Sequence, residues 1–175
     1  RFSAFFNPFN DLTGAGHQLA NSYYAMSNGG WFGLGLGNSI EKQGYLPEAH
    51  TDFVFAIVIE ELGFVGASLI LALLFFLILR VILVGIRAKN PFNSMMAIGI
   101  GGMMLVQTFI NIGAISGLIP STGVTFPFLS QGGNSLWVLS VAIAFVLNID
   151  ASEKRLRMKQ EGILFEEKGK IKSYY

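Results

Sequence analysis

Residues 53–79 read FVFAIVIEELGFVGASLILALLFFLIL, an apolar run that is interrupted by acids only at Glu60 and Glu61. About 20 predominantly apolar residues are enough for a helix to cross a membrane. Further along, residues 90–149 contain no Asp, Glu, Lys or Arg, which leaves room for two more crossings and a connection. The sequence therefore predicts an all-α polytopic membrane protein with helices over about 53–79, 94–115 and 134–149.

The composition agrees with a membrane protein. Of the 175 residues, 52% are hydrophobic and 13% are charged, which excludes an ordinary soluble globular domain. The absence of cysteine excludes disulfides and thiolate chemistry. The net charge is +1, and because the basic residues mark topology, no nucleic-acid partner is expected.

The positions of the cations predict the orientation. Three of the twelve Lys and Arg residues lie between the first and second predicted spans, and seven follow the third. Cations near membrane ends favour the cytoplasmic side. We therefore expect residues 150–175 to form a solvated, partly helical cytoplasmic tail and residues 1–52 to form an extracytoplasmic loop. Three spans with an outward start, and no initiator Met, predict the C-terminal part of a larger polytopic protein.

The predicted extracytoplasmic loop contains two recognisable segments. Residues 17–26 form an amphipathic piece that is expected to lie along the membrane interface. A glycine-rich run over 29–37 follows. Bare amides in such a run can cradle a phosphate, but no strand precedes the run and no Lys follows at the required place. A tight turn beside the membrane is therefore the favoured interpretation.

Titratable side chains gather just before the first span, at Glu48, His50 and Asp52. Residues two apart share a face in an extended segment, so the three are expected to converge. An acid held where water meets hydrocarbon is costly, and its presence there points to chemistry on a lipid-linked substrate. Two alternatives stay open. The three residues are a weak metal-ligand set, and Asp52 stands where a helix N-cap is common, a position that would also keep its carboxylate ionised.

Glu60 and Glu61 lie about two turns inside the first predicted span. Adjacent residues on a helix point roughly 100° apart. We therefore expect at most one of these carboxylates to face the protein interior, while the other reaches the interface or pairs with a neighbouring helix.

Residues 120–135 interrupt the uncharged region with two prolines and three glycines, so they cannot continue a helix. Irregular backbone at membrane depth is tolerated only where protein or a watery cavity satisfies its polar groups. The segment is predicted to be a re-entrant, cavity-lining loop. Ser130 lacks the context of a nucleophile elbow, so a serine nucleophile is not expected.

Several stretches closely resemble the SEDS family (shape, elongation, division and sporulation), and within it the division branch FtsW more than the elongation branch RodA. They read YLPEAHTDF at 45–53, EELG at 60–63, and run from Asn111 through GLIP at 117–120 to FLSQGGNS at 128–135. The resemblance extends to about Asp150. Gln131, where the family more often has Tyr, and Ser121, where Thr or Pro is usual, depart from the pattern and affect only details of the cavity.

The resemblance implies a ten-helix protein of the bacterial cytoplasmic membrane, of which the last three helices are present here. It implies peptidoglycan glycosyltransferase activity on lipid II, the undecaprenyl-pyrophosphate-linked disaccharide peptide. A class B penicillin-binding protein and other division proteins are the implied partners, and the septum is the expected location.

Within this family the acid matching Asp52 is held essential, and we expect it to be the general base of an inverting transfer. Positive charge for the leaving pyrophosphate is expected from Lys42, from the missing half, or from Mg²⁺ or Mn²⁺, for which no ligands are assigned. The residues expected to contact substrate are Lys42, Glu48, His50, Glu61, Thr122, Ser130, Gly132, Gly133, Asn134 and Ser135.

Two other functions stay open. A lipid II flippase needs a polar path through the bilayer, yet Ser68 is the only polar residue between Leu62 and Leu79. A non-catalytic scaffold of the division machinery would need only the tail and the exposed loop. Such a role would not explain the titratable cluster of Glu48, His50 and Asp52.

Overall fold

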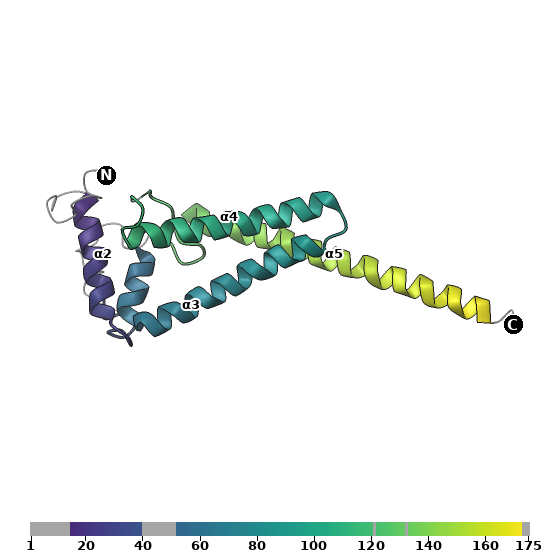
Figure 1. The fold of residues 1–175 in the computed structure, drawn as a ribbon, viewed down its shortest axis with the longest axis horizontal. Helices are drawn as coiled ribbons and strands as arrows, with labels where there is room; N and C mark the ends of the chain where they lie inside the picture. The colour runs from purple at the N-terminus through teal and green to yellow at the C-terminus, as the bar shows by residue number, and fades with distance from the viewer. Residues whose placement is uncertain (1–14, 40–51, 121, 132, 173–175) are drawn as a thin grey trace.

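The computed structural model describes residues 15–39, 52–120, 122–131 and 133–172, with side chains described as far as residue 160. The regular structure in these ranges is helical throughout (Figure 1): α2 (Ala15–Gly29), α3 (Val54–Arg87), α4 (Pro91–Ile115) and α5 (Gly133–Lys172). α3, α4 and residues 134–160 of α5 are each long and apolar enough to cross a membrane. The predicted all-α polytopic architecture is confirmed.

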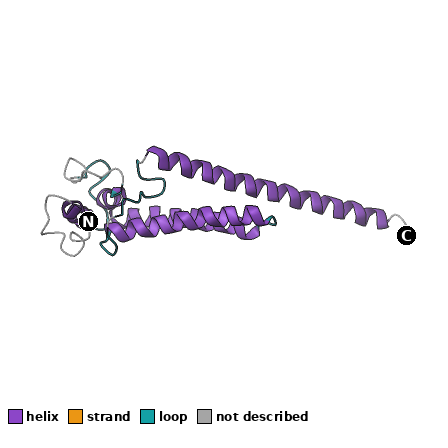
Figure 2. Ribbon diagram, turned by 90° about the horizontal axis from the view of Figure 1, so that it is seen from above, coloured by secondary structure: helices purple, strands orange, loops and turns teal. Residues whose placement is uncertain are grey.

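α3 and α4 form an antiparallel pair, and α5 crosses beside them and extends beyond their ends (Figure 2). We call the end of the bundle where α4 stops the loop end, and the end where α5 leaves it the tail end. Ile78 and Met104 are fully buried between α3 and α4. A Cβ on Gly101 would lie 2.6 Å from Cγ1 of Ile82, so this small residue permits the close approach of the two helices.

Two helices are longer than predicted. α3 continues past Leu79 to Arg87 and ends at its C-cap Ala88, whose backbone is extended. Asn90 then caps α4 by accepting a hydrogen bond from the Phe92 N–H (3.0 Å). α5 continues past Ile149 to Lys172. Charged residues end the apolar span of α5 without ending the helix, since Lys and Arg are good helix formers. The predicted tail is therefore helical through Lys172.

α3 is broken at Gly63, whose φ of 72° and ψ of 179° are not helical. Residues 54–62 turn away from the α3–α4 pair and lie beside α2 (Figure 1). Residues 30–35, which we call the clasp, satisfy the backbone groups that the break exposes. The clasp forms four hydrogen bonds with α3: Leu34 N–H to Glu60 O (2.9 Å), Gly35 N–H to Glu61 O (2.9 Å), Phe64 N–H to Gly30 O (2.9 Å) and Val65 N–H to Trp31 O (3.2 Å).

The clasp decides between the two interpretations of the glycine-rich run. The amides of Leu34 and Gly35 already donate to α3, so a phosphate cradle built on them is wrong and the tight turn is confirmed. Glycine is needed because the two backbones touch. A Cβ on Gly33 would lie 2.2 Å from the carbonyl oxygen of Glu61.

α2 begins two residues before the predicted amphipathic piece and ends three residues after it. Its buried face includes Leu19 and Ala25, and the Ser22 hydroxyl donates to the carbonyl of Ile115 at the end of α4 (3.3 Å). Figure 1 shows α2 running across the loop end of the bundle rather than along it. This placement agrees with a helix that lies in the interface while α3 and α4 span the membrane.

Candidate functional site

The candidate site lies at the loop end, where the start of α3 meets the last turns of α4 and the loop 116–131. Asp52 is half-buried here. α3 begins at Val54, and its N-cap position is Phe53, which makes no side-chain cap hydrogen bond. The first carbonyl to accept a helical hydrogen bond is that of Phe53, from Ala56 N–H (3.0 Å), so the N-cap position lies one residue after Asp52.

Asn111 connects Asp52 to the loop. Its Nδ2 group donates to the carbonyl of Asp52 (2.8 Å) and to the carbonyl of Val124 (2.7 Å). One turn earlier on α4, Gln107 donates through Nε2 to the carbonyl (3.0 Å) and the hydroxyl (3.2 Å) of Thr125. Two amide side chains of α4 thus hold residues 124–125 in place.

The loop folds back into the protein. Phe126 is 1% exposed and stacks on Phe55 of α3, with ring centroids 4.7 Å apart and planes inclined by 1°. The Ser130 hydroxyl accepts a hydrogen bond from the Phe126 N–H (2.6 Å), and the Ser130 N–H donates to the Phe126 carbonyl (3.2 Å). The part of the prediction that has this loop packed in protein is confirmed.

A groove of about 620 Å³ runs between α4 and α5. Its wall is mostly apolar, and its polar groups come from Gln107, Asn134 and Ser135. Val124 of the re-entrant loop also lines it, so the loop is cavity-lining as predicted. The full lining is Gly102, Met103, Val106, Gln107, Ile110, Val124, Asn134, Ser135, Val138 and Leu139.

The structure places the predicted substrate-contacting residues at different depths. Thr122 is exposed on the loop, Asn134 and Ser135 line the groove, and Ser130 is buried within the loop. Glu61 is nine residues beyond Asp52, about 13 Å along a helix, so the two acids do not meet. Lys42, Glu48, His50 and Gly132 lie outside the described residues, and Gly133 is described only as the first residue of α5.

Glu60 is the buried acid of the pair. Its side chain has no exposed surface, and the Ser39 hydroxyl donates to its Oε2 oxygen. Glu61 is half-buried. Its Oε1 atom is nevertheless buried, so the prediction that at most one of these carboxylates faces the interior is wrong. Glu60 links the chain just after the clasp to α3.

Replacing Ser39 with Ala should lower the free energy of unfolding by about 1–3 kcal/mol, because the buried Glu60 carboxylate would lose a donor. Thermal or denaturant unfolding of the full-length protein in detergent would measure the change. Ser68→Ala is the matched control, since among the described residues its exposed hydroxyl bonds only to the carbonyl of Val65 in its own helix. This substitution should change stability by less than about 0.5 kcal/mol. Equal effects of the two substitutions would contradict the prediction.

Gln107 and Asn111 were not predicted to be site residues from the sequence. They lie four apart in a span without charges, so they share one face of α4. This spacing of four residues was the feature of the sequence that could have identified them. Which carbonyls the two amides would meet depends on how the loop folds back, and no local pattern encodes this.

No ligand set for a divalent cation can be assigned. The described part of the chain contains no group of three His, Cys, Asp or Glu residues placed to hold a metal ion. Glu48 and His50 lie outside it.

Comparisons with known proteins point to one family. The FtsW/RodA/SpoVE family model, described as a cell cycle protein, matches residues 1–155. The chain is 64% identical over 160 residues to the probable peptidoglycan glycosyltransferase FtsW of Lactococcus lactis, covering 91% of this chain and 38% of that protein. It is 48% identical over 149 residues to the stage V sporulation protein E of Bacillus subtilis, covering 85% and 41%.

Two solved structures share the fold. A mutant of the rod shape determining protein RodA of Thermus thermophilus matches with a TM-score of 0.57 and 32% identity, covering 61% of this chain and 36% of that one. A chain of a peptidoglycan synthase complex that coordinates polymerization and crosslinking matches with a TM-score of 0.66 and 27% identity, covering 87% and 41%.

The chain spans about two fifths of the length of these curated relatives. The family model nevertheless covers most of the chain, and the three apolar helices agree with it. The resemblance to the SEDS family, and to its FtsW branch, is thereby confirmed. The chain belongs to the FtsW/RodA/SpoVE family of cell cycle proteins and is part of a multi-pass membrane protein.

Proposed function

We propose that the full-length protein containing this chain is a peptidoglycan glycosyltransferase that polymerises lipid II during septal wall synthesis, with Asp52 as the general base. The main support is the fixed position of Asp52 at the loop end of a membrane bundle, between α3, α4 and the re-entrant loop. The names of the FtsW relatives, which are probable peptidoglycan glycosyltransferases, support the activity.

The reaction needs one proton acceptor. The 4-hydroxyl oxygen of one lipid-linked disaccharide attacks the anomeric carbon of another, and a new C–O bond forms. The bond from that carbon to the pyrophosphate breaks, and its electron pair leaves with undecaprenyl pyrophosphate. The hydroxyl proton passes to the Asp52 carboxylate as the oxygen attacks. Because an α-linked donor gives a β-linked product, a single inverting displacement suffices and no covalent glycosyl enzyme is required.

The described residues suit a substrate that has a hydrocarbon chain and a polar head. The α4–α5 groove offers apolar side chains along α4, and its polar groups are Gln107, Asn134 and Ser135. The re-entrant loop, with Thr122 exposed on it, lies beside this groove. An apolar wall with a few polar groups at one place is the usual form of a site that orients a ligand.

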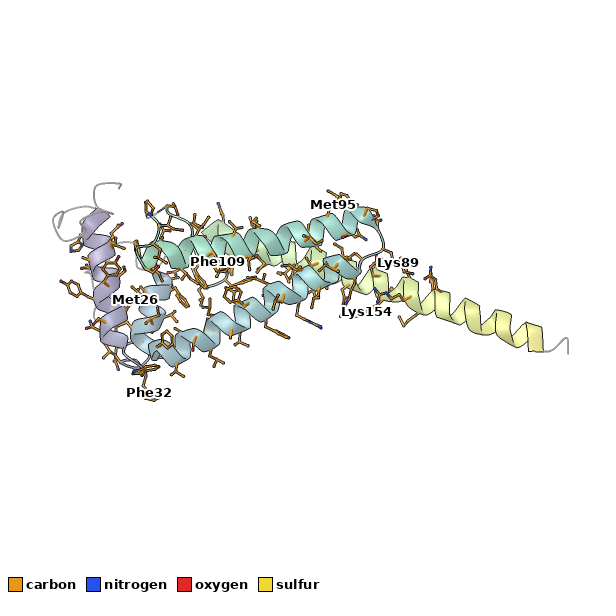
Figure 3. The ribbon with its side chains drawn as sticks, viewed as in Figure 1. Met26, Phe32, Lys89, Met95, Phe109 and Lys154 are labelled. Atoms are coloured by element: carbon orange, nitrogen blue, oxygen red, sulfur yellow. The ribbon has the colours of Figure 1, made fainter. Side chains whose placement is uncertain are left out.

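The location and partners belong to the same proposal. Lys89 and Lys154 lie together at the tail end of the bundle (Figure 3), and Arg87 and Arg157 meet there through a hydrogen bond from Nη2 of Arg157 to the carbonyl of Arg87 (2.9 Å). Cations gathered at one end favour a cytoplasmic tail. A class B penicillin-binding protein and other division proteins are the partners we propose, since one structural neighbour is part of a peptidoglycan synthase complex.

Polymerisation of fluorescent lipid II by the full-length protein, purified with its penicillin-binding partner, tests the proposal. The transpeptidase should be blocked with a β-lactam, so that glycan chains separate by length on a gel. Chains longer than the disaccharide are the expected result. Absence of chains, together with transbilayer movement of lipid II in vesicles, would replace the polymerase with a flippase. Absence of both chain formation and lipid II movement would favour the scaffold role.

A further inference from the structure

We infer that Asn111 is a positioning residue for Asp52: it fixes the main chain of the general base against the re-entrant loop. The inference rests on the proposed function, because it assigns a role relative to Asp52. It concerns a residue of α4 that need not touch substrate. Asn111 is 1% exposed, so it would act through the backbone of its neighbours.

The geometry allows one orientation of the Asn111 amide. Nδ2 carries two hydrogens, and each is directed at a carbonyl oxygen, of Asp52 at 2.8 Å and of Val124 at 2.7 Å. A flipped amide would place Oδ1 against both carbonyl oxygens and repel them. The side chain therefore holds two segments, 72 residues apart in the sequence, at a fixed separation.

The hydrogen bond to the Asp52 carbonyl also restricts the position of the Asp52 side chain. Its carbonyl lies just before the first helical carbonyl of α3, that of Phe53, and the Phe53 side chain is buried in the core. With the carbonyl tied to Asn111 on one side and Phe53 packed on the other, the backbone of Asp52 has little rotational freedom. The position of its Cα atom, from which the carboxylate extends, is thereby fixed.

A contribution to stability does not by itself explain why an asparagine stands at position 111. Oδ1 of Asn111 is buried and has no hydrogen-bond partner in the described structure, and a buried, unsatisfied acceptor is destabilising. A side chain that carries such a cost while holding the catalytic segment is better explained by the position that it imposes. A base displaced by about 1 Å can lose on the order of a hundredfold in rate.

Gln107 provides a matched comparison. It lies one turn away on the same helix, carries the same amide, and anchors the same loop through Thr125. Its hydrogen bonds run to the loop and not to Asp52. A loss of loop anchoring should therefore affect Gln107 and Asn111 variants alike, whereas a loss of Asp52 positioning should affect only the Asn111 variant.

The test compares Asn111→Leu with Gln107→Leu in the full-length protein purified with its partner, using fluorescent lipid II. We expect Asn111→Leu to lower kcat by about 10–100-fold with KM changed less than about threefold. Gln107→Leu, which also removes a polar group from the groove, is expected to raise KM while kcat falls much less than in Asn111→Leu. Equal losses of kcat in both variants, or an unchanged kcat in Asn111→Leu, would overturn the inference.

Two further variants keep the test decisive. If Asn111→Leu does not accumulate, Asn111→Ser keeps a small polar side chain with a single donor, so that at most one of the two carbonyls can be held, and the same loss of kcat without a rise in KM is expected. Asp52→Asn, measured in parallel, separates the two claims. A wild-type rate in that variant refutes the general base itself, whereas an inactive Asp52→Asn beside a fully active Asn111 variant refutes only the positioning role.

Discussion

Replacing Asp52 with Asn is expected to lower the rate of lipid II polymerisation by about 10²–10⁴-fold, the usual contribution of a general base. Asn has nearly the same shape as Asp and keeps the backbone carbonyl that Asn111 binds. What it loses is the ability to take the proton of the attacking hydroxyl. Chain formation from labelled lipid II, with co-purification of the penicillin-binding partner as the check on assembly, would measure the effect.

Asp150→Asn is the matched control for this substitution. It makes the same chemical change at the tail end, where Asp150 forms a surface pair with Lys154 at 2.6 Å. Such exposed pairs contribute little to stability, so the polymerisation rate should stay at the wild-type value. If Asp52→Asn behaved like this control, Asp52 would have no catalytic role, and the flippase and scaffold functions would become the leading ones.

Replacing Gly63 with Ala is expected to lower the free energy of unfolding by about 3 kcal/mol or more. The backbone of Gly63 lies at φ 72° and ψ 179°, a region that is essentially restricted to glycine and costs other residues about 1–3 kcal/mol. The added Cβ would also lie 2.4 Å from the Gly33 nitrogen and 2.5 Å from the Trp31 carbonyl oxygen. Both atoms belong to backbone, so the clasp would have to open.

The unfolding temperature of the full-length protein in detergent should fall by about 5 °C or more. Gly99→Ala serves as the control, because a Cβ on that α4 residue meets nothing within 4 Å and alanine favours the helix by about 1 kcal/mol. Its unfolding temperature should stay the same or rise. A Gly63→Ala protein as stable as the control would show that the break in α3 does not depend on the clasp.

The break also bears on the site. Residues 54–62 turn away from the α3–α4 pair only because α3 is interrupted at Gly63, and Asp52 precedes this turned segment directly. A continuous helix would carry its first residues elsewhere and remove the Asp52 carbonyl from Asn111. We therefore expect Gly63→Ala to lower polymerisation activity as well as stability.

Local pattern predicted some elements closely and others poorly. The span 94–115 was placed within three residues of α4, because Pro91 starts the helix and the loop after Ile115 ends it. The ends of α3 and α5 were placed too early, since a change from apolar to charged residues ends a membrane span but not a helix. Gly63 gave no sign of a break, because a lone glycine inside a helical pattern is often tolerated.

The sequence by itself determined the class of protein: long uncharged runs leave a membrane as the only suitable solvent, and Pro and Gly at 120–133 forbid a continuous helix through that segment. Only the tertiary structure decided which polar groups meet. The clasp at Gly63, the hydrogen bond from Ser39 to the buried Glu60, and the hydrogen bonds of Asn111 to Asp52 and Val124 all join segments distant in the chain. Hydropathy and periodicity report the environment of a residue, whereas hydrogen-bond partners depend on how whole segments pack.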